Sequence, residues 1–293
     1  MRKRKSDPAL PREAIGLTTY AQLDRYLAKF SSGELGLVLL LGRHGTGKSE
    51  SVKRSLSVLA PVNGSHTVAT RRLLYVEGHV RPYGLYRHLW EHRNCPIVLD
   101  DLDKLYADAN CVRLLKPLCN TQHEKRLTWL TNLTLNDSVV PASFTTTSNV
   151  ILIANEWRTI NPNVRALEDR AIILHFDPSK LEVHRRVGEW FQDEAVYDFI
   201  AGILPSITDL SMRHYCKASQ LRRAGLEDWQ TSLLQMVLPD PRLACVAALQ
   251  QRPSLESERE RVARFVAATG YSRATYFRMK SRLANAKGRD GGR

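Results

Sequence analysis

Short apolar runs alternate with amphipathic stretches ahead of residue 176, and the spacing leaves room for a helix between successive runs. Runs that are apolar throughout are typical of strands buried on both faces, as in a parallel sheet whose connections are helices. We predict five strands of such a sheet, over residues 36–41, 73–76, 97–99, 150–153 and 172–175. Helical periodicity between them covers, among others, residues 49–59, 85–91 and 109–119.

The strand signals end at Phe176-Asp177-Pro178, and only helical patterns follow. These patterns cover residues 181–191, 194–201 and 211–223, and three further short helices are expected after Pro239-Asp240-Pro241 interrupts the chain. We therefore predict four segments: a basic N-terminal arm over 1–15, an α/β core over 16–178, an α-helical region over 179–238 and a small all-α module over 239–293.

The composition is that of a folded globular chain. Its 293 residues are 43% hydrophobic and 25% charged, which excludes wholesale disorder and collagen-like repeats. The longest strongly apolar stretch, 35–41, is far too short to span a bilayer, and no secretory apolar region follows the first residues. The five cysteines are widely spaced without a C-x-x-C pair, so they suggest neither disulfides nor a zinc site. We expect a cytoplasmic protein with no membrane partner.

The formal net charge of +13 favours an anionic partner such as nucleic acid. Residues 251–293 hold eleven Lys and Arg against four Asp and Glu, so the excess is concentrated at the C-terminal end. A solvated basic tail explains this charge run as well as nucleic-acid contact does. The charge alone therefore leaves both interpretations open.

A phosphate-binding loop follows the first predicted strand. Residues 42–49 have the sequence GRHGTGKS, which satisfies G-x-x-x-x-G-K-[ST], and a helical stretch comes next. Glycines allow backbone N–H groups to curl around phosphate oxygens, and the helix directs its positive end toward them. Lys48 would neutralise the β- and γ-phosphates while the Ser49 hydroxyl ligates Mg²⁺. The predicted nucleotide-binding residues are Gly42, Gly45, Thr46, Gly47, Lys48, Ser49 and Glu50.

A pair of aspartates ends the third predicted strand. Asp100 would hold Mg²⁺ through water, and Asp101 would act as the base that polarises an attacking water. The alternative is a helix N-cap followed by a first-turn acid, because aspartate suits both positions. The upstream phosphate-binding loop favours the metal site, and the two motifs together predict ATP and Mg²⁺ as cofactors.

With these motifs in this order, the chain resembles the AAA+ ATPase family. The run 149–155 is similar to the family's sensor 1 strand, which implies that Asn155 senses the γ-phosphate and places the water. Residues 165–171 resemble the arginine-finger segment, which implies that Arg170 reaches a neighbouring subunit's nucleotide, with Arg165 as the competing candidate. Residues 210–215 resemble the sensor 2 motif of the family's lid.

For sensor 2 the resemblance implies that Arg213 contacts the γ-phosphate, with Arg222 and Arg223 as alternatives. The resemblance to the family covers about residues 16–234. It implies a P-loop NTPase fold, with a parallel five-stranded α/β sheet and an α-helical lid over 179–238. Most members place glutamate where this chain has Asp101, and aspartate there is also a feature of the DnaA, DnaC and IstB-like branch.

The resemblance implies an ATP-hydrolysing homo-oligomer, a ring or helical filament, which acts on DNA in replication initiation, helicase loading or transposition. A helicase or transposase partner is possible in that setting. Two other functions stay open: a transcriptional or partner-binding regulator with little turnover, and a P-loop small-molecule kinase.

The C-terminal module has the pattern of a helix-turn-helix. A helical stretch over 258–268 is followed by Thr269-Gly270-Tyr271, and Ser272 caps a second helix over 273–284. The pattern places Phe277 and Leu283 in its small core. We predict DNA contacts at the base edges from Arg273, Thr275 and Tyr276, and at phosphates from Arg278 and Arg282. The alternative is a basic hairpin that stabilises the lid or binds a partner protein.

Overall fold

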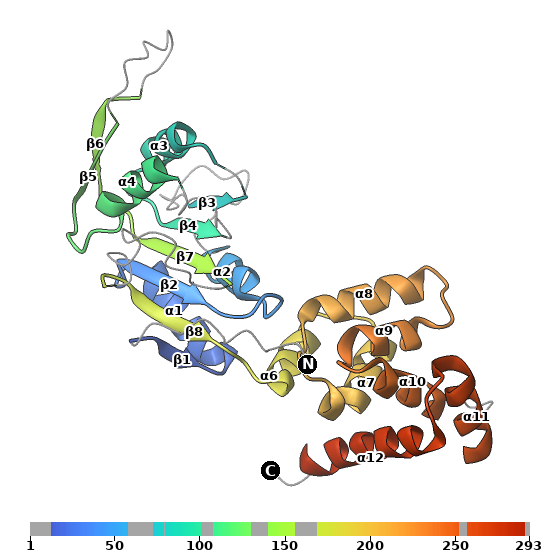
Figure 1. The fold of residues 1–293 in the computed structure, drawn as a ribbon. Helices are drawn as coiled ribbons and strands as arrows, with labels where there is room; N and C mark the ends of the chain where they lie inside the picture. The colour runs from blue at the N-terminus through green and yellow to red at the C-terminus, as the bar shows by residue number, and fades with distance from the viewer. Residues whose placement is uncertain are drawn as a thin grey trace. The chain divides into compact units, whose positions relative to one another are not determined.

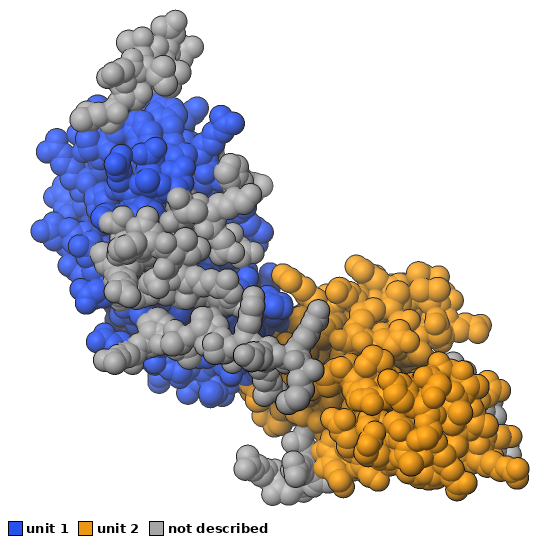
Figure 2. Space-filling view, in the orientation of Figure 1, with its two compact units in different colours: residues 1–178 blue, residues 179–293 orange. Residues whose placement is uncertain are grey.

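The computed structural model of the protein describes residues 13–57, 73–78, 80–100, 108–129, 140–155, 169–251 and 257–290, the last four by their backbone alone (Figure 1). Most of the predicted N-terminal arm lies outside these residues, as do Asp101 and Arg165. The chain divides into two compact units, residues 1–178 and 179–293, which Figure 2 shows in separate colours. Among the described helices, none is both long and apolar enough to cross a bilayer.

A parallel sheet forms the centre of the first unit (Figure 1). Its six strands lie in the order β1-β8-β2-β7-β4-β3, and every neighbouring pair is parallel. The strands are β1 (Ile15–Leu17), β2 (Leu37–Leu41), β3 (Leu74–Glu77), β4 (Ile97–Asp100), β7 (Val150–Ala154) and β8 (Ile172–Phe176).

All five predicted strands are therefore confirmed, and with them the α/β fold class of P-loop NTPases. Strand β1 was not predicted, because a three-residue edge strand with glycine at its centre gives almost no strand signal.

Helices cover the sheet because its strands are apolar on both faces. Leu37, Leu39 and Leu41 belong to one buried cluster with side chains of α3 (Pro82–Glu91) and α4 (Ala109–Leu118). The alternate residues of β2 point to the opposite face, since side chains of a strand alternate. The other two helices in the described part of this unit, α1 (Tyr20–Ser31) and α2 (Lys48–Leu56), pack against each other.

A separate antiparallel pair, β5 (Lys125–Thr128) and β6 (Ser143–Thr146), was not predicted. Both strands are short and mostly polar, so their sequences carry little strand signal. Lys125 is buried, and its Nζ donates to the carbonyl oxygen of Ser148 at 2.6 Å. Burial lowers the pKa of the Lys125 ammonium. Leu127 on β5 and Phe144 on β6 are buried in the hydrophobic core of the first unit.

The second unit is helical throughout its described residues. It consists of α6 (Lys180–Gly188), α7 (Glu194–Ile203), the 3₁₀ turn η3 (Leu204–Ser206), α8 (Met212–Arg223), α9 (Trp229–Val237), α10 (Pro241–Gln250), α11 (Glu258–Thr269) and α12 (Arg273–Asp290). One hydrophobic cluster contains side chains from both 179–238 and 239–293, including Leu234, Leu249 and Tyr276. The two predicted helical segments thus share a core.

The predicted pair of C-terminal helices is present, with defined ends. Ser257 and Glu260 form a capping box at the start of α11, and Gly270 ends that helix with a left-handed φ of 71°. The Ser272 hydroxyl accepts a hydrogen bond from the Thr275 N–H at 3.4 Å, near the start of α12. The second helix extends to Asp290, beyond its predicted end at residue 284.

Candidate functional site

The strand order brings three predicted motifs to one edge of the sheet. In the register, Leu41 pairs with Ala154 and Asp100 pairs with Ile153, so β2, β7 and β4 end side by side. The phosphate-binding loop follows β2, Asn155 follows β7, and Asp100 is the last residue of β4. In parallel α/β sheets, ligands bind at this carboxyl edge.

The loop adopts a conformation that only its glycines allow. Gly45 and Gly47 have φ values of 76° and 78°, in the left-handed region. At Gly42 an added Cβ atom would lie 2.2 Å from the carbonyl oxygen of Phe176. Gly47 begins α2 without a side-chain cap, so the first N–H groups of that helix face the loop as donors for an anion.

Lys48 connects the loop to Asn155. Its side chain is only 5% exposed, and its Nζ donates to the carbonyl oxygens of Gly42 at 2.5 Å and Arg43 at 2.8 Å. A third contact of Nζ is with Oδ1 of Asn155, at 3.1 Å. A buried ammonium at the end of a glycine-rich loop is a cation that a phosphate group can neutralise. The site therefore fits a phosphate group.

Neighbouring elements hold the loop in place. The Tyr20 hydroxyl on α1 donates to the carbonyl oxygen of Thr46 at 2.6 Å, and the Thr46 hydroxyl donates to the carbonyl oxygen of Arg43 at 2.9 Å. Arg43 forms an ion pair with Asp177, with 2.9 Å between Nε and Oδ1. The loop conformation is thus fixed by the protein itself. Glu50, predicted to bind nucleotide, is exposed on the first turn of α2.

A hydroxyl group that was not predicted contacts one of the two predicted metal-binding residues. Tyr75 on β3 donates to Oδ2 of Asp100, which is buried, and the nearby Ser49 side chain acts on the pKa of the same hydroxyl. Burial, followed by the contact with Asp100, raises the pKa of the Tyr75 hydroxyl. An aromatic residue in a strand normally indicates only core packing, which is why Tyr75 was missed.

Ser49 and Asp100 offer the oxygen ligands that Mg²⁺ prefers, and the Tyr75 hydroxyl contacts Asp100 with the Ser49 side chain nearby. This arrangement fits a magnesium ion. Asp101, the predicted base, lies outside the described residues.

Arg170 lies at the other edge of the sheet. It is exposed in the turn just before β8, and its Nη1 donates to the carbonyl oxygen of Lys116 at 3.2 Å. Since β8 is parallel to β2, residues before β8 lie at the edge opposite the phosphate-binding loop. The five residues of β8 span about 17 Å. Arg170 is therefore badly placed to reach the nucleotide site of its own subunit.

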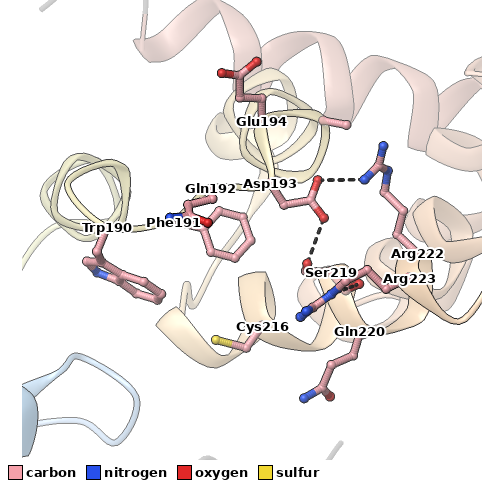
Figure 3. Close-up of a pocket in the computed structure, with 11 residues that line it drawn as sticks. Trp190, Phe191, Gln192, Asp193, Glu194, Cys216, Ser219, Gln220, Arg222 and Arg223 are labelled. Atoms are coloured by element: carbon pink, nitrogen blue, oxygen red, sulfur yellow. Dashed lines mark hydrogen bonds and ion pairs between the residues drawn. The ribbon is translucent and has the colours of Figure 1, made fainter.

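The three arginines considered for sensor 2 differ in their surroundings. Arg213 is exposed in the first turn of α8. Arg222 forms an ion pair with Asp193, with 3.2 Å between Nη1 and Oδ1, and the Ser219 hydroxyl donates to the same carboxylate at 2.8 Å (Figure 3). Arg222 and Arg223 line a pocket of about 820 Å³ together with Trp190 and Phe191. The ion pair with Asp193 engages Arg222 within the helical unit, and Arg213 and Arg223 are the exposed arginines outside that pair.

One predicted DNA-binding residue is wrong. Tyr276 is fully buried, and its ring packs against that of Phe265 with 5.6 Å between centroids. The buried residues of α12 are Tyr276, Met279 and Leu283, spaced so that they lie on one face of the helix. Phe277, predicted to be in the core, is instead 37% exposed. Leu283 is buried as predicted, so the prediction was wrong only in choosing Phe277 over Tyr276. Burial raises the pKa of the Tyr276 hydroxyl.

The other predicted DNA-binding residues differ in their exposure and in their contacts. Arg273 and Arg278 are exposed, and Thr275 is half-buried, with its hydroxyl 3.3 Å from that of Ser272. Arg282 is held near a carboxylate, with 3.6 Å between its Nη1 and Oδ2 of Asp240. The exposed charge on α12 is therefore smaller than the sequence suggests.

Gly42→Ala is expected to lower the free energy of unfolding by about 2–4 kcal/mol, because its methyl group would overlap the carbonyl of Phe176. The loop would have to move, so nucleotide affinity should fall as well. Gly36→Ala is the matched control, since a Cβ atom there meets nothing within 4 Å. Urea denaturation and nucleotide titration of both variants measure the effect. Equal stability of the two variants would contradict the described loop geometry.

No protein-family model matches this chain, and none of the curated proteins matches it in sequence. Among solved structures, it is similar to NtrX from Brucella abortus in complex with ATP, at 13% identity and a TM-score of 0.36, over 93% of this chain and 69% of that one. It is also similar to the same protein in complex with ADP, at 13% identity and a TM-score of 0.39, over 92% and 69%.

Proposed function

We propose that this protein is an AAA+ type ATPase that binds MgATP at the carboxyl edge of its sheet and hydrolyses it. The observation that carries the proposal is the hydrogen bond between Lys48 Nζ and Asn155 Oδ1. It joins the lysine of the phosphate-binding loop to the polar residue at the end of the adjacent strand. In the sheet, β7 leads to Asn155 and lies between β2, which leads to the loop, and β4, which ends at Asp100. This order brings the three groups together.

Each residue has a distinct role in this proposal. The N–H groups at the start of α2 would bind phosphate oxygens, and Lys48 would exchange a neutral acceptor for the phosphates. Ser49 and Asp100 would hold Mg²⁺, which when bound neutralises phosphate charge. Asp101 would accept the proton of the attacking water, and Asn155 would orient that water by a hydrogen bond.

Hydrolysis is distinguished from phosphoryl transfer to a metabolite by the products formed. We expect the purified protein with MgATP to release inorganic phosphate in equal amount to ADP, because Asn155 is placed to orient water. Asp101→Asn is expected to slow this release about 100-fold, since it removes the base. Phosphate release and nucleotide binding are measured on both proteins. Transfer of phosphate to an added nucleotide or metabolite, with no release to water, would instead identify a kinase.

A regulator that uses ATP as a conformational ligand would bind nucleotide with very little turnover. The shorter side chain of Asp101 is the feature that favours this second function. The wild type and Asp101→Asn would then bind nucleotide equally well, and both would release negligible phosphate. That result would support the regulator over the ATPase.

We further propose that the active form is a homo-oligomer, since Arg170 lies at the edge of the sheet away from its own nucleotide site. Nucleotide bound at the interface between subunits would then favour assembly, and hydrolysis would favour release. Light scattering with ATP and with ADP tests this switch. Replication initiation, helicase loading and transposition remain the settings that the family resemblance suggests.

We also propose that α11 and α12 contact DNA. Five arginines on the described part of these helices are exposed, and four of them lie in no ion pair there, namely Arg259, Arg264, Arg273 and Arg278. Two other basic residues contact carboxylates within the unit. Lys280 pairs with Glu258 at 2.6 Å, and Arg282 lies near Asp240. The surface would therefore engage about four phosphates.

Duplex DNA affinity is accordingly expected to fall with salt at a logarithmic slope of about −4, because each neutralised phosphate contributes about 0.9. Arg278→Ala should make this slope shallower by about one unit. Arg185→Ala, an exposed arginine on α6, is the control that should leave the slope unchanged. Fluorescence anisotropy at several salt concentrations measures it. DNA affinity that does not depend on salt would rule out this surface.

A further inference from the structure

A cluster of three potential metal ligands lies at the C-terminal end of α3, and the nucleotide site does not use it. His88, Glu91 and His92 each offer one ligand atom, and these atoms all lie within 4.8 Å of one another. The Nδ1 atom of His88 is 3.5 Å from Oε2 of Glu91. Two ligands at about 2.1 Å from a tetrahedral zinc ion are about 3.4 Å apart. One edge of a zinc coordination sphere is thus already formed.

The helix sets this spacing. Residues three and four positions apart lie on the same helical face, so His88 presents its ring beside both Glu91 and His92. The helix itself is anchored by buried Leu85, Tyr86 and Leu89. The rings of the two histidines are 6.4 Å apart between centroids, which leaves space for an ion between them.

The tautomer of His92 suits a metal ligand. Its Nδ1 lies 3.0 Å from the carbonyl oxygen of His88, and since a carbonyl can only accept, Nδ1 is the donor. The other nitrogen, Nε2, then carries the lone pair. Histidines that bind metals typically donate their second ring nitrogen to a carbonyl or carboxylate in this way, which fixes the ring. Nε2 is therefore the nitrogen of His92 that can bind a metal ion while this hydrogen bond is kept.

Arg87 orients the carboxylate of Glu91, the third potential ligand. Its Nε donates to Oε1 of Glu91 at 2.7 Å, which leaves Oε2 directed at His88. The guanidinium also places a positive charge next to the cluster, which opposes cation binding. Arg87 thus orients Glu91 and at the same time weakens the site.

The cluster is separate from the proposed magnesium site. The strands β3 and β4 are parallel and α3 connects them, so the C-terminal end of α3 lies at the edge of the sheet where β4 begins. The phosphate-binding loop and Asp100 lie at the opposite edge. Two imidazoles and one carboxylate also select a borderline transition ion such as Zn²⁺, whereas Mg²⁺ prefers oxygen ligands alone.

From this geometry we propose that His88, Glu91 and His92 form a zinc site with three protein ligands and one position open to water. His88 and Glu91 are exposed, and His92 is half-buried. The proposal does not depend on ATP hydrolysis.

Titration of the full-length protein with Zn²⁺ alone, in nucleotide-free buffer, tests the proposal. We expect one equivalent of zinc at this site. His88→Ala and His92→Ala should each weaken its affinity by at least about tenfold. His123→Ala removes an exposed histidine of the same unit outside the cluster and should leave the affinity unchanged. Circular dichroism should show that all three variants fold like the wild type.

A fourth variant gives a change of opposite sign. Arg87→Ala removes a positive charge that repels the zinc ion, and it should tighten zinc binding by about threefold. Excess Mg²⁺ should not displace the zinc. The proposal is overturned if the wild type binds no zinc, or if the folded His88→Ala and His92→Ala variants bind it as tightly as the wild type does. Binding by cysteine thiols would give that second result.

Discussion

Lys48→Ala is expected to reduce ATP hydrolysis by at least about a thousandfold, because it removes the cation that neutralises charge on the transferred phosphate. The side chain is buried, and its ammonium bridges the loop to Asn155. Its loss therefore removes both a phosphate contact and the connection between two strands. Phosphate release at saturating ATP and nucleotide affinity measure the two effects separately.

Two further variants distinguish a chemical effect of Lys48 from loss of folding. Lys48→Arg keeps the charge, but its planar fork does not match acceptors that were arranged for an ammonium, so activity should remain low. Lys29→Ala removes an exposed lysine that pairs with Glu34 on the surface, and it should retain full activity. If folded Lys48→Ala hydrolysed ATP at the wild-type rate, the candidate site would be wrong.

Much of the site was predictable because its motifs follow the ends of apolar strands. Lys48, Asp100 and Asn155 each follow or end a predicted strand, and parallel strands bring their carboxyl ends to a common edge. Their convergence therefore depends only on the strand order. In contrast, Tyr75 acts through a contact across strands, and nothing in its local sequence indicates that its hydroxyl reaches Asp100.

The helical unit shows where sequence patterns fail. Tyr276 and Phe277 are adjacent aromatic residues, and a helical pattern with few apolar residues does not determine which of them faces the core. The packing of α12 against α10 and η3 decides it. Similarly, the pattern assigned Arg282 to a phosphate contact, but the carboxylate of Asp240, distant in sequence, lies 3.6 Å from it. Contacts between distant segments cannot be read from local periodicity.

Arg170→Ala is expected to lower ATP hydrolysis by about a thousandfold without a matching loss of nucleotide affinity, because an arginine finger stabilises charge mainly in the transition state. Arg113→Ala, which removes another exposed arginine of the first unit, should leave the rate unchanged. Arg165→Ala is measured in parallel. A loss confined to Arg165→Ala would transfer the finger to that residue.

Mixing two inactive variants tests whether Arg170 acts on a neighbouring subunit. The Arg170→Ala subunit keeps Lys48 and Asn155, while an Asn155→Ala subunit keeps Arg170. In an equimolar random oligomer, about a quarter of the interfaces combine an intact nucleotide site with an intact arginine, so about a quarter of the wild-type rate should return.

If Arg170 served its own subunit, every site in the mixture would lack one of the two groups, and activity would stay at the average of the two variants. The position of Arg170 before β8, at the edge opposite the phosphate-binding loop, favours recovery. The distance along β8, about 17 Å, is too great for an arginine side chain to span. Recovery of activity on mixing would therefore place the complete site at an interface between two copies of the chain.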